Sequence, residues 1–247
     1  MDIISKPSPN FNERPQGQIP DLLLLHYTGM KTGAEALERM RDPAAKVAAH
    51  YMIETDGTVY QLVAEDKRAW HAGISSWQGE TDINGCSIGI EIVNPGHEFG
   101  YQAFPDGQMQ SVATLCKAII QKYSIRADRV LGHSDVAPDR KMDPGEKFNW
   151  QWLASEGVGL WPKDTQENTV HENDKITLKY GDVGVQVDAL QAQMTAIGYG
   201  LDVSSRYDRM TEYGVAAFQR HWRQQKVSGV ADGETQNLIE AILKAKV

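Results

Sequence analysis

The sequence has few cysteines and no long apolar run. Of its 247 residues only two are cysteine, Cys86 and Cys116, and they form no CxxC pair. A disulfide-built scaffold is therefore excluded, and nothing requires an oxidising compartment. No apolar run approaches the length of a transmembrane helix, and the four leucines at residues 22–25 indicate a buried strand instead.

Positive charge is also scarce. Lys and Arg total 25 against 33 Asp and Glu, which gives a formal charge of −8 and a pI near 5.4. This balance argues against nucleic acid or an anionic membrane as partner, since both require a basic surface. The N-terminus shows no basic region followed by an apolar stretch, so no secretory signal is visible. We therefore expect a cytoplasmic location, with periplasmic location or phage-type release left open, and the oligomeric state also stays open.

Residues 20–162 have the pattern of an α/β protein. After a Pro- and Asn-rich lead (residues 1–20) that wraps or dangles, apolar runs predict strands at 22–25, 47–55, 58–63, 87–93 and 129–131. Asp56-Gly57 predicts a hairpin between the second and third of these. Helical periodicity predicts helices at 32–41 and 108–123. Together these elements predict a mixed central sheet flanked by helices.

The last third of the chain has a different composition. Residues 163–174 are polar and predict a linker. Apolar spacing then predicts three short helices, around 183–194, 211–224 and 233–245, which can bury a small core. We therefore expect one domain at 1–162 and a second at 175–247. No catalytic cluster is visible in the second domain, where His221 is expected at the surface.

The loop at residues 132–145 concentrates chemically useful side chains. His133, Lys141 and Asp143 stand among Pro and Gly residues after a predicted strand, which argues against regular structure there. An imidazole and a carboxylate suit a divalent metal, zinc most readily, and a lysine beside them can stabilise an oxyanion. The alternative is a solvated, Asp-rich loop without function.

Two further residues point to the same chemistry. His26 ends a buried strand, where side chains leave the sheet at the usual position of a site in an α/β fold. Glu91 lies in an otherwise apolar strand, where a charged carboxylate is costly unless it is paired or functional. The alternatives are a structural histidine and a glutamate on a solvated sheet face.

Four weaker candidates surround them. His50 is expected within a strand, as a core histidine, a residue supporting the site or a contact to substrate. Trp70 and His71 are expected in a loop, where they could line a substrate groove. His97 follows Pro95-Gly96 and is expected as an exposed loop residue.

The order of these motifs resembles the type 2 N-acetylmuramoyl-L-alanine amidases, a family that shares its fold with peptidoglycan recognition proteins. The resemblance covers nearly all of residues 20–162 and rests on Leu25-His26-Tyr27-Thr28, Ala49-His50-Tyr51, Trp70-His71-Ala72-Gly73, Ile88-Gly89-Ile90-Glu91 and the segment 132–145. Residues 178–235 are similar to the three-helix peptidoglycan-binding module. One departure is the segment Ser204–Asp208, which replaces the module's usual Asp-Gly turn.

The resemblance implies a zinc ion held by His26, His133 and Asp143. It further implies Glu91 as catalytic acid/base and Lys141 as the residue that steadies the oxyanion. The implied reaction cleaves the amide between N-acetylmuramic acid, or its 1,6-anhydro form, and L-alanine in peptidoglycan or muropeptides. Two alternatives are a peptidoglycan-binding protein without catalysis and a zinc peptidase with another substrate.

Overall fold

The computed structural model describes residues 1–162 and 175–246, and the first of these ranges folds around a six-stranded sheet. The strand order is β1-β5-β4-β7-β3-β8. The strands are β1 (Ile3–Ser5), β3 (Leu22–Tyr27), β4 (Tyr51–Ile53), β5 (Val59–Gln61), β7 (Ser87–Ile92) and β8 (Val130–Gly132). Within this six-stranded sheet of the described residues, only the β4–β5 pair, the predicted hairpin, is antiparallel. The predicted mixed sheet is confirmed.

The N-terminal lead wraps around the sheet and does not dangle. Within it β1 pairs with β5 at the sheet edge. A second strand, β2 (Phe11–Glu13), pairs antiparallel with β6 (Lys67–Ala69) in a small separate sheet. The lead is therefore part of the fold.

Helices cover the sheet and connect its strands. They are α1 (Gly33–Arg41), α2 (Ile83–Cys86), α3 (Gly96–Phe99), α4 (Asp106–Tyr123), α5 (His133–Val136) and α6 (Trp150–Ser155), with 3-10 turns at Pro43–Ala45 and Ala127–Arg129. The Thr32 side chain caps α1 by accepting the Glu35 N–H, which explains the start of that helix. The short helix α5 shows that the expectation of no regular structure directly after Gly132 was wrong.

Strand β3, between β7 and β8, is buried on both faces, which explains its continuous run of leucines. Leu23 and Leu25 pack in one core with the apolar side of α4, whereas Leu22 and Leu24 belong to another core. Because side chains alternate along a strand, His26 lies on the face of Leu22 and Leu24. The site is built on this face.

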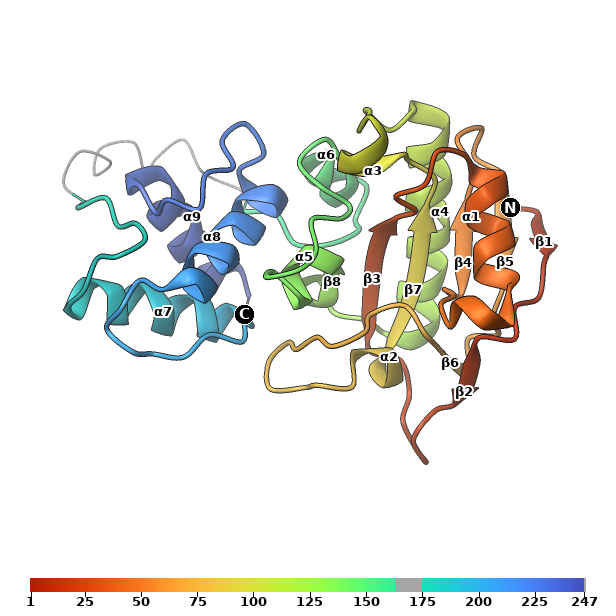
Figure 1. Cartoon of the computed structure of the whole chain (residues 1–247), viewed down its shortest axis with the longest axis horizontal. Coiled ribbons are helices and arrows are strands. Elements are labelled where there is room, and N and C mark those ends of the chain that lie inside the picture. Colours follow the sequence, from red (N-terminus) through yellow and green to blue (C-terminus); the bar gives the residue numbers. More distant parts are fainter. Residues whose placement is uncertain (163–174, 247) are drawn as a thin grey trace.

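Three helices follow at the C-terminal end: α7 (Val185–Ile197), α8 (Arg209–Trp222) and α9 (Gly233–Ala245). The three predicted helices are confirmed, although Val183 precedes α7 and is exposed. They lie beside α5 and β8 (Figure 1). The predicted linker, 163–174, lies outside the described residues.

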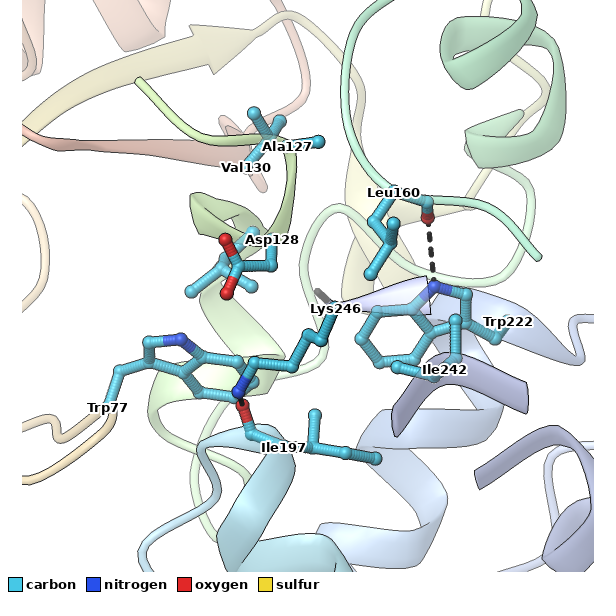
Figure 2. A pocket seen from close by; sticks show the side chains of 10 residues that line it. Trp77, Ala127, Asp128, Val130, Leu160, Ile197, Trp222, Ile242 and Lys246 are labelled. Carbon is cyan, nitrogen blue, oxygen red and sulfur yellow. Dashed lines mark hydrogen bonds between the residues drawn. The ribbon is translucent and has the colours of Figure 1, made fainter. Parts of the chain in front are cut away.

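The C-terminal helices share a core with the sheet. One continuous cluster of buried side chains includes Leu22, Leu24 and Trp77 together with Val187 and Phe218. At this junction Trp222 Nε1 donates to the Leu160 carbonyl across 3.1 Å (Figure 2). The cavity drawn there leaves only about 10 Å³, room for a single water. The two parts are thus packed together and not merely connected along the chain.

His221 contradicts its prediction at this junction. It is only 2% exposed, and its ring stacks on Trp150 and Trp222 at centroid distances of 3.8 and 3.7 Å. Its polar neighbours in the sequence suggested a surface residue, but the partners that bury it come from both parts of the chain. Within the described residues, no helix is long and apolar enough to cross a membrane.

Candidate metal centre

The chemically active residues meet at the carboxyl ends of parallel strands. His26 is the last but one residue of β3, and His133 directly follows β8. Asp143 is brought back to them because the Ser134 N–H donates to the Asp143 carbonyl across 3.0 Å. All three side chains are buried. A strand end, a helix start and a returning loop thus bring together residues up to 117 positions apart.

The geometry of these three residues fits a tetrahedral metal. His26 Nδ1 lies 2.9 Å from His133 Nδ1 and 3.0 Å from Asp143 Oδ2, and the third distance, His133 Nδ1 to Asp143 Oδ2, is 3.1 Å. Ligand atoms bound about 2.0–2.1 Å from a tetrahedral zinc lie roughly 3.3 Å apart. The three atoms therefore form one face of such a tetrahedron, with room for a fourth ligand. Among the described residues, His26, His133 and Asp143 form a group whose ligand atoms lie close enough together to hold one metal ion.

The opposite nitrogens of both histidines have partners that fix the ring orientation. His133 Nε2 donates to the Ala72 carbonyl across 2.9 Å, which leaves Nδ1 without a proton and able to bind a metal. His26 Nε2 lies 3.1 Å from His71 Nδ1. A metal bound to His26 Nδ1 would leave the proton on Nε2, and Nε2–H would then donate to His71 Nδ1. The His71 Nε2–H would in turn face Ser87 Oγ, 3.3 Å away. The dipeptide His71-Ala72 therefore supports both candidate ligands.

His71 can approach His26 because Gly89 has no side chain. A Cβ built on Gly89 would lie 2.5 Å from His71 Nδ1, closer than atoms tolerate. Gly89 stands on the site face of β7, two residues before Glu91. His71 lines a groove that opens over the three candidate ligands, as expected, but only 6% of its surface is exposed. Its contacts indicate support of His26 more than contact with substrate.

The structure does not bring His50 or Trp70 to the groove. His50 precedes β4 and is fully buried; its Nδ1 accepts the Gly89 N–H, and its Nε2 lies 3.0 Å from both Arg14 and the Lys67 carbonyl. Trp70 Nε1 donates to Asn12 in the small sheet across 2.7 Å. Their nitrogens are used within the fold, so neither placement supports the expected contact with substrate.

Glu91 faces the metal centre from the neighbouring strand. The register of β3 and β7 pairs it directly with His26, so both side chains lie on the same face. Its Oε2 is buried and has no hydrogen-bond partner. Burial, together with the Asp143 carboxylate, raises the pKa of Glu91 well above its ordinary value, and the Lys141 ammonium opposes this shift. The chemistry of Glu91 is thus that of a carboxyl group able to exchange a proton beside the three candidate metal ligands.

A groove of about 360 Å³ opens over the centre. Its walls include His133, Glu91, Lys141 and Asp143, with the rim completed by Tyr27, Thr28, Gly29, Arg39, Val47, His71, Pro95, Gly96, His97, Glu98, Arg140 and Met142. The five principal predicted site residues therefore converge, because His26 lies directly beneath, against His133 and Asp143.

Sequence reasoning missed one side of this groove. His97 was expected in an exposed loop, but it stands in α3, its Nε2 lies 3.1 Å from Glu146 and its Nδ1 lies 3.0 Å from the Tyr27 hydroxyl. Because a carboxylate can only accept, Nε2–H donates to Glu146, and in the neutral ring Nδ1 accepts from the Tyr27 hydroxyl. Burial, with the Asp143 charge, raises the pKa of Tyr27 to about 12. The position of Tyr27, next to His26 at a strand end, was the signal available in the sequence.

The buried histidines predict a pH dependence for the metal-free protein. Burial lowers the pKa of His26 to about 4 and that of His50 to about 3, and it holds the pKa of His71 well below its usual range. Below about pH 6.5 the unfolded chain binds protons at these rings and the folded chain does not, so stability falls as pH falls towards 4. Glu91 has the opposite effect: because its pKa is raised, the folded chain keeps a proton there that the unfolded chain loses. This offsets the proton of one of the three histidines.

Between about pH 6 and 5 the unfolded chain therefore binds at most two more protons than the folded chain. We expect the free energy of unfolding to fall there by at most about 3 kcal/mol for each pH unit. Urea unfolding of chelator-treated protein at several pH values measures this. A free energy that stays constant across this window would show that these histidines are solvated in the folded protein.

Comparison with known proteins identifies the family. Residues 16–146, more than half of the chain, match the N-acetylmuramoyl-L-alanine amidase family. The chain belongs to this family. Residues 183–239 match a peptidoglycan binding domain, as the three-helix pattern predicted. The chain is thus an amidase of the expected type with a helical C-terminal domain.

Two relatives show how far the likeness extends. The chain is 34% identical to the N-acetylmuramoyl-L-alanine amidase AmiD of Escherichia coli, over 98% of this chain and 90% of AmiD. It is 38% identical to the 1,6-anhydro-N-acetylmuramyl-L-alanine amidase AmpD of the same organism, over 58% of this chain and 86% of AmpD. The first likeness includes the C-terminal helices; the second covers about the length of the catalytic part.

Solved structures agree with this fold. The complex of E. coli AmiD with anhydro-N-acetylmuramic acid-L-Ala-D-gamma-Glu-L-Lys superposes with a TM-score of 0.78 at 33% identity, covering 94% of this chain and 92% of AmiD. AmpDh3 of Pseudomonas aeruginosa gives a TM-score of 0.81 at 31% identity, covering 93% of each chain. The arrangement of the sheet and the C-terminal helices is therefore shared with these amidases.

Proposed function

We propose that this amidase binds one zinc ion through His26, His133 and Asp143 and hydrolyses the amide between N-acetylmuramic acid, or its 1,6-anhydro form, and L-alanine in muropeptides. The observation that carries the proposal is the set of three ligand atoms about 3 Å apart at the floor of an open groove. The substrate class is supported by AmiD, which was solved with an anhydro-muropeptide.

The residues around the centre suit this reaction. A zinc ion held there would supply Lewis-acid polarisation and lower the pKa of a water. The positive charge of a bound zinc ion would favour the ionised form of Glu91. In that form Glu91, with its free buried Oε2, accepts the proton of the attacking water and delivers it to the leaving amine. The Lys141 ammonium faces the oxygen of the scissile carbonyl as negative charge develops on it. Burial would raise the pKa of Asp143, but the charges and hydrogen bonds of His133 and His26 hold it well below its usual range, so it is an anionic ligand.

Zinc analysis and a product assay on one muropeptide test this proposal together. We expect one zinc per chain, loss of hydrolysis on chelation, and its return when zinc is added. The products are free anhydro-N-acetylmuramic acid and an intact stem peptide that begins with L-alanine. A cut within the stem peptide would instead identify a zinc peptidase, and zinc binding without any product would identify a binding protein.

Two histidine variants identify the ligand set. His133→Ala removes one of three protein ligands and is expected to lose most of its zinc. His97→Ala is the matched control, because His97 lines the same groove and is not among the three ligands. Unchanged zinc content in His133→Ala would remove this residue from the centre.

A further inference from the structure

The Asp135 carboxylate joins the metal-binding loop to the C-terminal helices. Asp135 lies in α5, two residues after His133, and is only 1% exposed. Its Oδ2 accepts the Gly132 N–H across 2.8 Å, a bond within the loop. Its other two partners come from the C-terminal part: the Tyr199 hydroxyl donates to Oδ1 across 2.7 Å, and His221 Nδ1 donates to Oδ2 across 2.8 Å.

Both C-terminal partners are themselves held in place. The His221 ring stacks on Trp150, which belongs to the catalytic part, and on Trp222 of its own helix. The Tyr199 ring packs edge-to-face on Trp77 of the catalytic part, with centroids 5.0 Å apart. This packing fixes the direction from which each donor approaches the Asp135 carboxylate.

Fixing Asp135 also fixes the candidate zinc ligands. The single turn of α5 carries His133 at its start, and the next residue, Ser134, donates its N–H to the Asp143 carbonyl. A buried carboxylate is costly without donors, so Asp135 is stable in this position only while its partners are present. A turn that is free to shift would displace His133 and Asp143 together.

We propose that Tyr199 and His221 are positioning residues of the metal centre, acting through Asp135 from the C-terminal helices. Neither touches the ligand atoms or the groove. The C-terminal part then has a role in the catalytic centre besides any role in binding peptidoglycan. This inference rests on the proposed zinc site, and a pre-ordered ligand set raises metal affinity because less ordering is needed on binding.

Zinc affinity, measured by competition with a chelator, tests the role of Tyr199. Tyr199→Phe removes one hydroxyl and keeps the ring that packs on Trp77. We expect zinc to bind about tenfold more weakly, which is the smaller of the losses in affinity that follow when a group that orients a metal ligand is removed. We also expect muropeptide hydrolysis to fall at limiting zinc and to recover when zinc is in excess.

Tyr207→Phe is the matched control. The Tyr207 hydroxyl is also buried and donates to the Gly229 carbonyl across 2.7 Å, but both residues belong to the C-terminal part. Its loss is expected to lower the melting temperature about as much as Tyr199→Phe and to leave zinc affinity unchanged. This comparison separates positioning of the centre from general stability.

Two variants of His221 separate its hydrogen bond from its stacking. His221→Phe keeps an aromatic ring between the tryptophans and removes the donor. His221→Asn loses the ring and keeps an N–H close to the position of Nδ1. We expect weaker zinc binding in the first and near-normal binding in the second.

Equal zinc affinity in wild type, Tyr199→Phe and His221→Phe would overturn the positioning role and leave the proposed function intact. The same loss of affinity in Tyr207→Phe would also overturn it, since the effect would then be one of stability. A wild-type protein that binds no zinc would overturn both proposals.

Discussion

Glu91→Gln is expected to keep the zinc and the fold and to lower turnover by roughly 100- to 10,000-fold. Glutamine has the shape of the neutral glutamate and cannot accept a proton. The free, buried Oε2 and the raised pKa of Glu91 place this group where the proton must be received. Because burial already favours the uncharged form, we expect no large change in the melting temperature.

The measurement is kcat and KM on a soluble muropeptide, with zinc content determined on the same samples. Glu98→Gln is the matched control, because Glu98 is a carboxylate at the exposed rim of the same groove. It is expected to retain most of its turnover. Near-normal kcat in Glu91→Gln at full zinc occupancy would mean that Glu91 is only a residue of the sheet.

The sequence predicted most of the fold where the signal is local. The periodic apolar residues of α4, the Asp56-Gly57 turn and the leucine run of β3 each determine their own element. His26 was predicted from its position at a strand end, and Glu91 from the cost of a charged carboxylate in an otherwise apolar strand. Their direct pairing across β3 and β7 depends on register, which the sequence does not show.

The residues that support the site could not be predicted in the same way. The role of His71 depends on Gly89, which leaves space for its ring on a strand that follows later in the chain. The roles of His97 and His221 depend on Glu146 and Asp135, their partners far away in the sequence. A side chain whose environment is made by distant residues carries no local pattern, so both histidines were expected at the surface.

The contact between the two parts of the chain could not be predicted from the sequence either. A polar stretch at 163–174 predicts a linker, and a linker suggests two parts that can be separated. The contacts show instead that Trp77 packs against Tyr199 and that Trp150 stacks on His221. Composition shows where a connection runs, but the extent of the packed surface appears only in three dimensions.

A chain ending at residue 162 is therefore expected to lose stability and hydrolysis of soluble muropeptides, and not only action on insoluble peptidoglycan. Removing the C-terminal helices exposes Trp77 and Trp150, which are 1% and 3% exposed in the whole chain. Two large apolar side chains returned to water cost about 3–6 kcal/mol, a large share of a typical stability of about 5–15 kcal/mol. Asp135 also loses both donors from the C-terminal part.

The control keeps both parts and cuts only their connection. A protease site inserted within 163–174 allows the full protein to be cleaved after folding. If the shared core holds the parts together, the cleaved protein keeps its melting temperature and its activity on the soluble substrate, whereas the truncated chain loses both. Full activity and an unchanged melting temperature in the truncated chain would show that the C-terminal helices serve only as a tethered module, whose benefit is confined to polymeric substrate.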